Sequence, residues 1–153
     1  MLFVCTGNTC RSPMAEAIAR RRASELGWDH VEVGSAGVAA FSGSPASEGA
    51  LDASAAHGLD LSNHRSTLLT DDLAAEADLI LTMSTSHLMR LIELGSGARA
   101  ALLTSYAGGL DDASGVDVAD PIGGTSEEYQ ETFRMLDQLI GRVLDRLQPV
   151  LAK

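Results

Sequence analysis

Four short apolar runs, separated by segments of helical length, restrict most strongly how this chain can fold. The runs are Leu2–Val4, His30–Gly37, Leu79–Leu81 and Ala101–Leu103. Runs of this length are typical of strands, and strands that alternate with helices form parallel sheets covered on both faces. We therefore expect an α/β fold with three layers, α/β/α, on a small parallel sheet of about four strands with right-handed crossovers.

Capping residues and glycines predict where the first helices begin and end. Ser12 is expected to cap a helix that has Pro13 in its first turn and that ends at Leu26, before Gly27. A second helix is expected over 46–57. Each of these helices is the next element after an apolar run, as the alternation requires.

Further helices are expected on either side of the third apolar run, a short one within 70–78 and another within 84–95. Residues 107–126 are rich in glycine and aspartate, which predicts a long loop. The last helix, 125–148, has the clearest apolar face and starts with the capping box Thr125–Glu128.

Size, charge and cysteine content exclude several classes of protein. The 153 residues suit a single domain, 1–153, and no apolar run approaches the ~18–20 residues of a membrane helix. A net charge of −10 opposes binding to nucleic acid or to an anionic membrane. The two cysteines form no disulfide framework and the histidines are scattered, so we expect a cytoplasmic protein with no metal and no cofactor.

The segment "CTGNTCRSP" joins the first apolar run to the first helix and predicts an anion site. Backbone N–H groups converge in such a loop, and the helix dipole behind them favours negative charge. Gly7 is expected to permit the tight backbone, and the Arg11 guanidinium suits two phosphate oxygens. The loop lacks the lysine of a nucleotide P-loop. The candidate phosphate-binding residues are Thr6, Gly7, Asn8, Thr9, Cys10 and Ser12, with Arg11 as clamp.

Cys5 lies at the mouth of this loop, where the same field stabilises a thiolate. A thiolate that faces a bound phosphoryl group predicts transfer of phosphate to cysteine and then to water. One alternative is a pair of buried structural cysteines beside a helix cap. A non-catalytic phosphate-binding module is another, although it has no use for Cys5 together with an acid.

These residues resemble the phosphate-binding loop of the low-molecular-weight protein phosphatases, with its signature C-x5-R-[ST]. The resemblance extends along nearly the whole chain through "GSAG" at 34–37, "ADLILTM" at 77–83 and "DP" at 120–121. It implies that Cys5 is the nucleophile and Arg11 the phosphate clamp.

The resemblance also assigns a general acid and a supporting network. Asp120 would protonate the leaving group, although the residues alone do not distinguish it from the other acids of its loop, Asp111, Asp112 and Asp117. A polar network that shapes the loop would involve Asn8, Ser12, Ser35 and His64. For His64, a free surface histidine is an equal alternative.

Two departures from the tyrosine-specific branch favour another substrate. "DP" is followed by Ile122-Gly123-Gly124 instead of aromatic residues that stack on a phenol ring, and Thr9 replaces a bulkier aliphatic residue. "CTGNTCRSP" with "DP-x-GG" resembles the bacterial protein-arginine phosphatases, in which the threonine helps to select phosphoarginine. The resemblance implies phosphorylated proteins as partners and a protein-arginine phosphatase, with a protein-tyrosine phosphatase as the alternative. Phe41 is expected either to wall the pocket or to pack under a loop.

Cys10 is a second thiol on the same loop, so we expect it to be a redox partner that captures an oxidised Cys5; a small buried residue is the alternative. Arsenate reductases of the thioredoxin-coupled type resemble the loop but need cysteines after Cys10, which this chain lacks. The basic run 20–22 is expected to be a solvated helix face and not a docking patch.

Overall fold

A computed structural model of the chain describes residues 1–110 and 114–151. Its centre is a four-stranded sheet in the order β2-β1-β3-β4. The strands are β1 (Leu2–Cys5), β2 (Gly34–Gly37), β3 (Ile80–Thr82) and β4 (Ala100–Leu102). Each neighbouring pair runs parallel. The α/β fold with a small parallel sheet is therefore confirmed.

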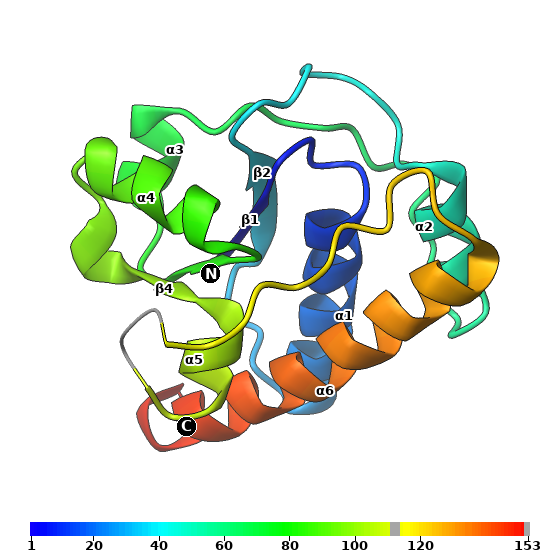
Figure 1. Cartoon of the computed structure of the whole chain (residues 1–153). Helices are drawn as coiled ribbons and strands as arrows, with labels where there is room; N and C mark the ends of the chain where they lie inside the picture. The colour runs from blue at the N-terminus through cyan, green and yellow to red at the C-terminus, as the bar shows by residue number, and fades with distance from the viewer. Residues whose placement is uncertain (111–113, 152–153) are drawn as a thin grey trace.

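Helices cover both faces of the sheet (Figure 1). They are α1 (Arg11–Glu25), α2 (Glu48–Ala55), α3 (Asp71–Glu76), α4 (Thr85–Glu93), α5 (Leu103–Ala107) and α6 (Ser126–Leu151), with a 3-10 helix, η1 (Gly97–Arg99). Because side chains alternate across a strand, Phe3 packs in one core with α1 and α6, while Leu2 and Val4 pack in a second core on the opposite face. The sheet is the middle layer of three.

The start of α1 differs from the prediction in a way that matters for the site. The helix begins at Arg11, and the residue at its N-cap, Cys10, makes no side-chain capping bond. The prediction that Ser12 caps the helix is wrong, because Ser12 lies inside the first turn and is fully buried. Its hydroxyl points into the loop, as described below. At the other end, Gly27 stops the helix with a φ of 74°, as expected.

The second strand is shorter than the predicted 30–37, since only Gly34–Gly37 pairs with the four residues of β1. The second helix is also shorter than the predicted 46–57, because it begins after its capping residue Ser47 and ends at Ala55. The short helix α5 was not predicted, and β4 lies one residue earlier than 101–103. The helices expected within 70–78 and 84–95 are confirmed as α3 and α4, which are capped by Thr70 and Ser84.

The basic run 20–22 is partly solvated, since Arg20 is exposed and Arg21 and Arg22 are half-buried, but it also joins α1 to its surroundings. Arg20 pairs with Glu16, and Arg22 lies 3.0 Å from Asp137 on α6. Arg21 donates to the backbone carbonyl of His57. Each guanidinium therefore has an intramolecular partner.

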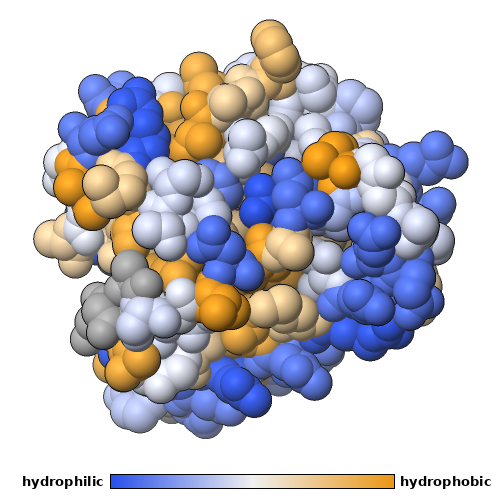
Figure 2. All heavy atoms as spheres, in the orientation of Figure 1, coloured by the Kyte–Doolittle hydropathy of each residue, from blue (hydrophilic) through white to orange (hydrophobic). Residues whose placement is uncertain are grey.

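Hydrophilic residues gather over α2 and the adjoining start of α6, whereas the centre of the same face is mixed (Figure 2). Within the residues described, no helix is both long and apolar enough to cross a bilayer.

Candidate functional site

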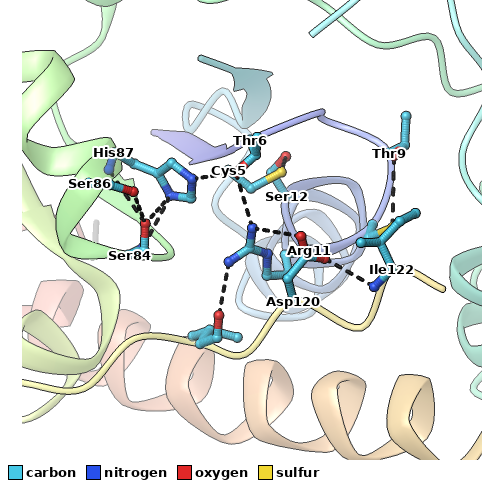
Figure 3. Close-up of polar contacts among 12 residues, drawn as sticks. Cys5, Thr6, Thr9, Arg11, Ser12, Ser84, Ser86, His87, Asp120 and Ile122 are labelled. Atoms are coloured by element: carbon cyan, nitrogen blue, oxygen red, sulfur yellow. Dashed lines mark hydrogen bonds and ion pairs between the residues drawn. The ribbon is translucent and has the colours of Figure 1, made fainter. Parts of the chain in front are cut away.

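The loop 6–10 connects the carboxyl end of β1 to α1 and forms one wall of a cavity (Figure 3). The cavity has a volume of about 180 Å³. It is lined by Cys5, Thr6, Gly7, Thr9, Cys10, Arg11, Asp120 and Ile122. Asp120 and Ile122, which are far from the loop in sequence, thus meet it where the sequence predicts an anion site, at the carboxyl end of the first strand.

The tight backbone of the loop is made by Asn8 and Gly37, and the expectation for Gly7 is wrong. Asn8 has a φ of 55°, in the left-handed region, whereas a Cβ at Gly7 would only touch Thr9 Oγ1 at 3.7 Å. A Cβ at Gly37, by contrast, would lie 2.5 Å from the carbonyl oxygen of Thr6. The glycine that the loop requires is therefore on β2, where the loop packs against the backbone.

The side chain of Asn8 is fully buried and saturated with hydrogen bonds. Its Nδ2 donates to Ser12 Oγ at 2.7 Å and to Ser35 Oγ at 2.9 Å. Its Oδ1 accepts from the backbone N–H of Thr67 at 2.8 Å. These bonds hold the unfavourable φ of Asn8, whose cost is typically about 1–3 kcal/mol.

His64 belongs to the same network and is not a free surface histidine. Its Nε2 donates to the carbonyl oxygen of Asn8 at 2.7 Å. Ser35 passes the network outward, since its hydroxyl donates to Glu16 Oε1 at 2.8 Å. The four residues that the resemblance groups together are therefore connected in this structure, through Asn8.

Cys5 is buried, and its Sγ lies 2.9 Å from Ser12 Oγ. Because Ser12 Oγ already accepts from Asn8, the hydroxyl proton of Ser12 is available to the sulfur. With Cys5 as a thiolate, which can only accept, the direction of the bonds is Asn8 to Ser12 to Cys5. This arrangement suits a sulfur that carries negative charge.

Arg11 is nearly buried and bridges the loop to the segment that carries Asp120 (Figure 3). Its Nη1 donates to the carbonyl oxygen of Val118 at 2.9 Å. Its Nη2 lies 3.4 Å from Thr6 Oγ1 and 3.5 Å from Asp120 Oδ2. The side chain of Asp120 is 41% exposed, so this ion pair contributes little stability.

The aspartates described in the 107–126 loop lie in different places and have different partners. Asp120 borders the cavity, and its Oδ1 accepts from the backbone N–H of Ile122 at 3.1 Å. Asp117 instead accepts from the backbone N–H of Thr85 at 2.9 Å, at the start of α4. Asp111 and Asp112 lie outside the described residues. Of the aspartates described in this loop, Asp120 is the one that faces Cys5.

Cys10 contacts two hydroxyl groups that the sequence analysis missed. Its Sγ lies 3.1 Å from Ser47 Oγ and 3.5 Å from the Tyr129 hydroxyl. Burial and the hydrogen bond with Cys10 raise the pKa of Tyr129. A Cβ at Gly49 would lie 2.3 Å from the Tyr129 ring, so a glycine there allows α2 and α6 to meet beside the sulfur.

His87 is the functional-site residue that the sequence analysis passed over. Its ring is buried on α4, and its Nε2 lies 2.9 Å from Thr6 Oγ1. Burial, and then the charge of Arg11, lowers the pKa of His87 to about 4, against the opposing effect of Asp117 and Asp120. The available signal was its place three residues after Ser84, where a capping box has its second member.

Phe41 is 86% exposed and does not pack under a loop. It lies between β2 and α2 and is not part of the cavity lining. Among the residues that the structure describes, no cluster of histidine, cysteine and carboxylate side chains is arranged to hold a metal ion.

Known proteins are similar to this chain in sequence and in fold. The sequence matches the low molecular weight phosphotyrosine protein phosphatases over residues 1–152. A protein-arginine-phosphatase of Bacillus subtilis is 37% identical over 150 residues, which cover 97% of this chain and 96% of the relative. A probable low molecular weight protein-tyrosine-phosphatase, EpsP of Ralstonia nicotianae, is 34% identical over 148 residues, which cover 97% of this chain and 95% of the relative.

A solved structure of the arginine phosphatase YwlE, a variant with a phosphorylated active-site serine, superimposes with a TM-score of 0.90. It is 36% identical and covers 97% of this chain and 95% of its own. The family match over almost every residue, the curated relatives and the shared fold agree with one another. The chain therefore belongs to the low molecular weight phosphotyrosine protein phosphatase family, a family of phosphatase enzymes.

Proposed function

We propose that the protein hydrolyses phosphoarginine in proteins through a cysteinyl-phosphate intermediate. In the first step the Cys5 sulfur bonds to phosphorus while the phosphorus–nitrogen bond breaks, and Asp120 gives a proton to the departing guanidine nitrogen. The N–H groups of the loop and the Arg11 guanidinium hold the phosphoryl oxygens.

In the second step water attacks phosphorus and the sulfur–phosphorus bond breaks. Asp120, now a carboxylate, takes the proton from that water, and inorganic phosphate leaves. Cys5 departs as a thiolate that accepts a hydrogen bond from the Ser12 hydroxyl, which in turn accepts one from Asn8. Atoms and charges therefore return to the starting state after each turnover.

The observation that carries the choice of phosphoarginine is a carboxylate, Asp120, at the border of a cavity whose described lining has no aromatic residue. Thr9 and the Asp120 carboxylate border the same small space as Cys5, and the lining residues, all in the described part of the chain, include no aromatic ring. A guanidinium is planar and rich in N–H donors, so it is suited to a carboxylate acceptor. A relative at 37% identity named as a protein-arginine-phosphatase supports this substrate.

A protein-tyrosine phosphatase with the same mechanism is the second candidate, and one observation favours it. Ile122 borders the cavity and is 57% exposed, so an apolar side chain is available to a phenol ring at the mouth. The relative EpsP is named as a probable protein-tyrosine-phosphatase at 34% identity.

The deciding experiment is phosphate release from an arginine-phosphorylated protein and from a phosphotyrosine peptide, side by side. We expect a large preference for phosphoarginine, abolished in Cys5→Ser. Thr9→Val, which removes only the hydroxyl's hydrogen-bonding capacity, is expected to lower kcat/KM for phosphoarginine by about tenfold and to leave phosphotyrosine unaffected. A preference for phosphotyrosine would establish the second candidate, and no Cys5-dependent release would leave a phosphate-binding module.

We also propose that Cys10 protects Cys5 from irreversible oxidation. Hydrogen peroxide oxidises the Cys5 thiolate to a sulfenic acid, and the Cys10 thiolate then attacks that sulfur and expels hydroxide, which forms a disulfide. Two thiol equivalents of dithiothreitol reverse it. We expect peroxide-treated wild type to recover with dithiothreitol and Cys10→Ser to recover far less; equal recovery of the two would contradict the proposal.

A further inference from the structure

We propose that His87 is a positioning residue that fixes the Thr6 hydroxyl as an acceptor for Arg11, and thereby the orientation of the guanidinium that binds phosphate. The inference rests on the proposed cysteine phosphatase chemistry, but it is independent of whether the substrate is phosphoarginine or phosphotyrosine. Thr6 and His87 lie 81 residues apart in sequence, so folding alone brings them together.

The proton of the imidazole is located by the hydrogen bonds on its other nitrogen. The backbone N–H of Ser84 donates to His87 Nδ1 at 3.1 Å, and Ser84 Oγ lies 3.0 Å from the same nitrogen. A nitrogen that accepts an N–H bond carries no proton, so the neutral ring has its proton on Nε2. His87 therefore donates to Thr6 Oγ1.

This donation determines what Thr6 offers to Arg11. A hydroxyl rotates, and it accepts from a guanidinium only when its own proton points elsewhere. With His87 Nε2–H on one lone pair of Oγ1 and Arg11 Nη2–H facing the other at 3.4 Å, both lone pairs face donors. Neither of these two contacts uses the Thr6 hydroxyl proton. Because Thr6 lines the cavity, this proton is a further hydrogen-bond donor beside the phosphate site.

Arg11 depends on this acceptor because its other two partners, Val118 and Asp120, are not held equally firmly. Nη1 is held by the buried Val118 carbonyl at 2.9 Å. Nη2 has Thr6 on one side and Asp120, 41% exposed, on the other (Figure 3). When Asp120 turns to a leaving group, Thr6 and Val118 are the contacts that keep the plane of the guanidinium.

A histidine is suited to position 87 because its ring can form hydrogen bonds on two opposite sides. At the third position of a helix a glutamate or glutamine normally folds back to the capping residue. His87 does this with Nδ1 and still presents an N–H from the opposite side of a rigid ring to Thr6. One buried side chain thus joins the start of α4 to the loop 6–10.

The test uses two matched pairs of variants and para-nitrophenyl phosphate, an activated aryl ester. His87→Asn keeps an acceptor near the Nδ1 position but loses the donor, whereas His87→Gln extends an amide to the Nε2 position. Thr6→Val removes the hydroxyl and Thr6→Ser keeps it. We expect His87→Asn and Thr6→Val each to lower kcat by about tenfold with KM changed less than about twofold, and the Gln and Ser variants to recover most of it.

The decisive comparison is the double variant His87→Asn/Thr6→Val. Residues that act as one unit show no further loss, so we expect kcat to stay at about one tenth of wild type, whereas independent effects would multiply to about one hundredth and overturn the proposal. His30→Asn, on a histidine bonded to the backbone of Leu151, is the control expected to behave as wild type.

A second measurement does not depend on activity. In ¹⁵N NMR of the imidazole we expect a protonated Nε2 and an unprotonated Nδ1 for His87 at pH 7, and a shifted Arg11 guanidinium signal in Thr6→Val. A proton on Nδ1 would overturn the proposal. If wild type released phosphate neither from the aryl ester nor from an arginine-phosphorylated protein, the proposed phosphatase function would fail, and NMR would still decide whether His87 orients Thr6.

Discussion

The loop 6–10 and the segment 115–124 face each other across one cavity, but they are held in opposite ways. In the loop, buried Asn8 is bonded through both ends of its side-chain amide, and His64 holds its carbonyl. In the segment, the bonds described here concentrate before Asp120, which is itself 41% exposed. The nucleophile side is thus rigidly preorganised, whereas the acid side has few restraints beyond Val118, as suits a group that follows a leaving group.

Asp120→Asn gives the largest expected effect and separates catalysis from stability. The amide has no proton to give to the leaving group, so kcat is expected to fall by about 10²–10³-fold. Because the carboxylate is half exposed, the free energy of unfolding should change by less than about 1 kcal/mol. Steady-state kinetics and urea unfolding on the same samples measure both.

A leaving-group series makes this prediction sharper. With an aryl phosphate whose phenol leaves without protonation, the loss from Asp120→Asn should shrink toward the size of one hydrogen bond. An equal loss for good and poor leaving groups would show that Asp120 acts only on Arg11.

On the rigid side, Asn8→Ala is expected to damage catalysis and stability together. It leaves an alanine at a φ of 55° and removes the bonds that orient Ser12 and Ser35. We expect a loss of about 2–4 kcal/mol in the free energy of unfolding and of about 10²-fold in kcat. Asn8→Gly, which relieves the backbone but not the lost bonds, should recover part of the stability and little of kcat; identical unfolding of the two variants would contradict this.

His87 joins the start of α4 to the loop 6–10, and its titration predicts a dependence of stability on pH. Its pKa is lowered from 6.5 to about 4 in the folded protein, so the unfolded chain binds a proton that the folded one does not. The stabilisation is present above pH 6.5 and is lost as the pH falls toward 4, by on the order of 2 kcal/mol.

Urea unfolding at pH 7 and pH 4.5 measures this loss. Carboxylates titrate in the same pH range, so the pH dependence of the unfolding free energy is compared between wild type and His87→Asn. The variant should have the flatter dependence. Parallel dependences for the two proteins would show that His87 is readily protonated in the folded state.

The prediction of the fold succeeded because its signals are local. Apolar runs and the glycine after α1 are signals carried by neighbouring residues, and most element types follow from them. The wrong prediction at the start of α1 has an identifiable cause. Ser12 has the residue type of a cap, but its hydroxyl is used by Cys5 and Asn8, and the tertiary bond overrides the local preference.

The candidate site divides in the same manner. Cys5, Arg11 and Ser12 lie within one short stretch, so the sequence was enough to group them. His87, Tyr129 and Gly37 reach the loop only through the packing of α4, α6 and β2, and no spacing along the chain connects them to Cys5. The resemblance to a family selected Asp120, and the geometry supplies the reason, since Asp117 bonds to Thr85 at the start of α4 instead.

Asp117→Ala is expected to have the smallest effect. It tests whether the segment 115–124 divides into an anchored half before Asp120 and an exposed half that begins at Asp120. The carboxylate accepts from the backbone N–H and the hydroxyl of Thr85, at the positive end of α4. Its removal should cost about 1 kcal/mol of unfolding free energy and lower kcat by no more than about threefold, because Val118 still bonds to Met83 and Arg11.

Asp117→Asn, which keeps an acceptor oxygen, is the matched control and should recover most of the stability. If Asp117→Ala instead lowered kcat as strongly as Asp120→Asn, the anchored and the exposed halves of the segment would act as one unit. Asp120 would then owe its position to the start of α4, and the contrast between a rigid nucleophile side and a loosely held acid side would no longer stand.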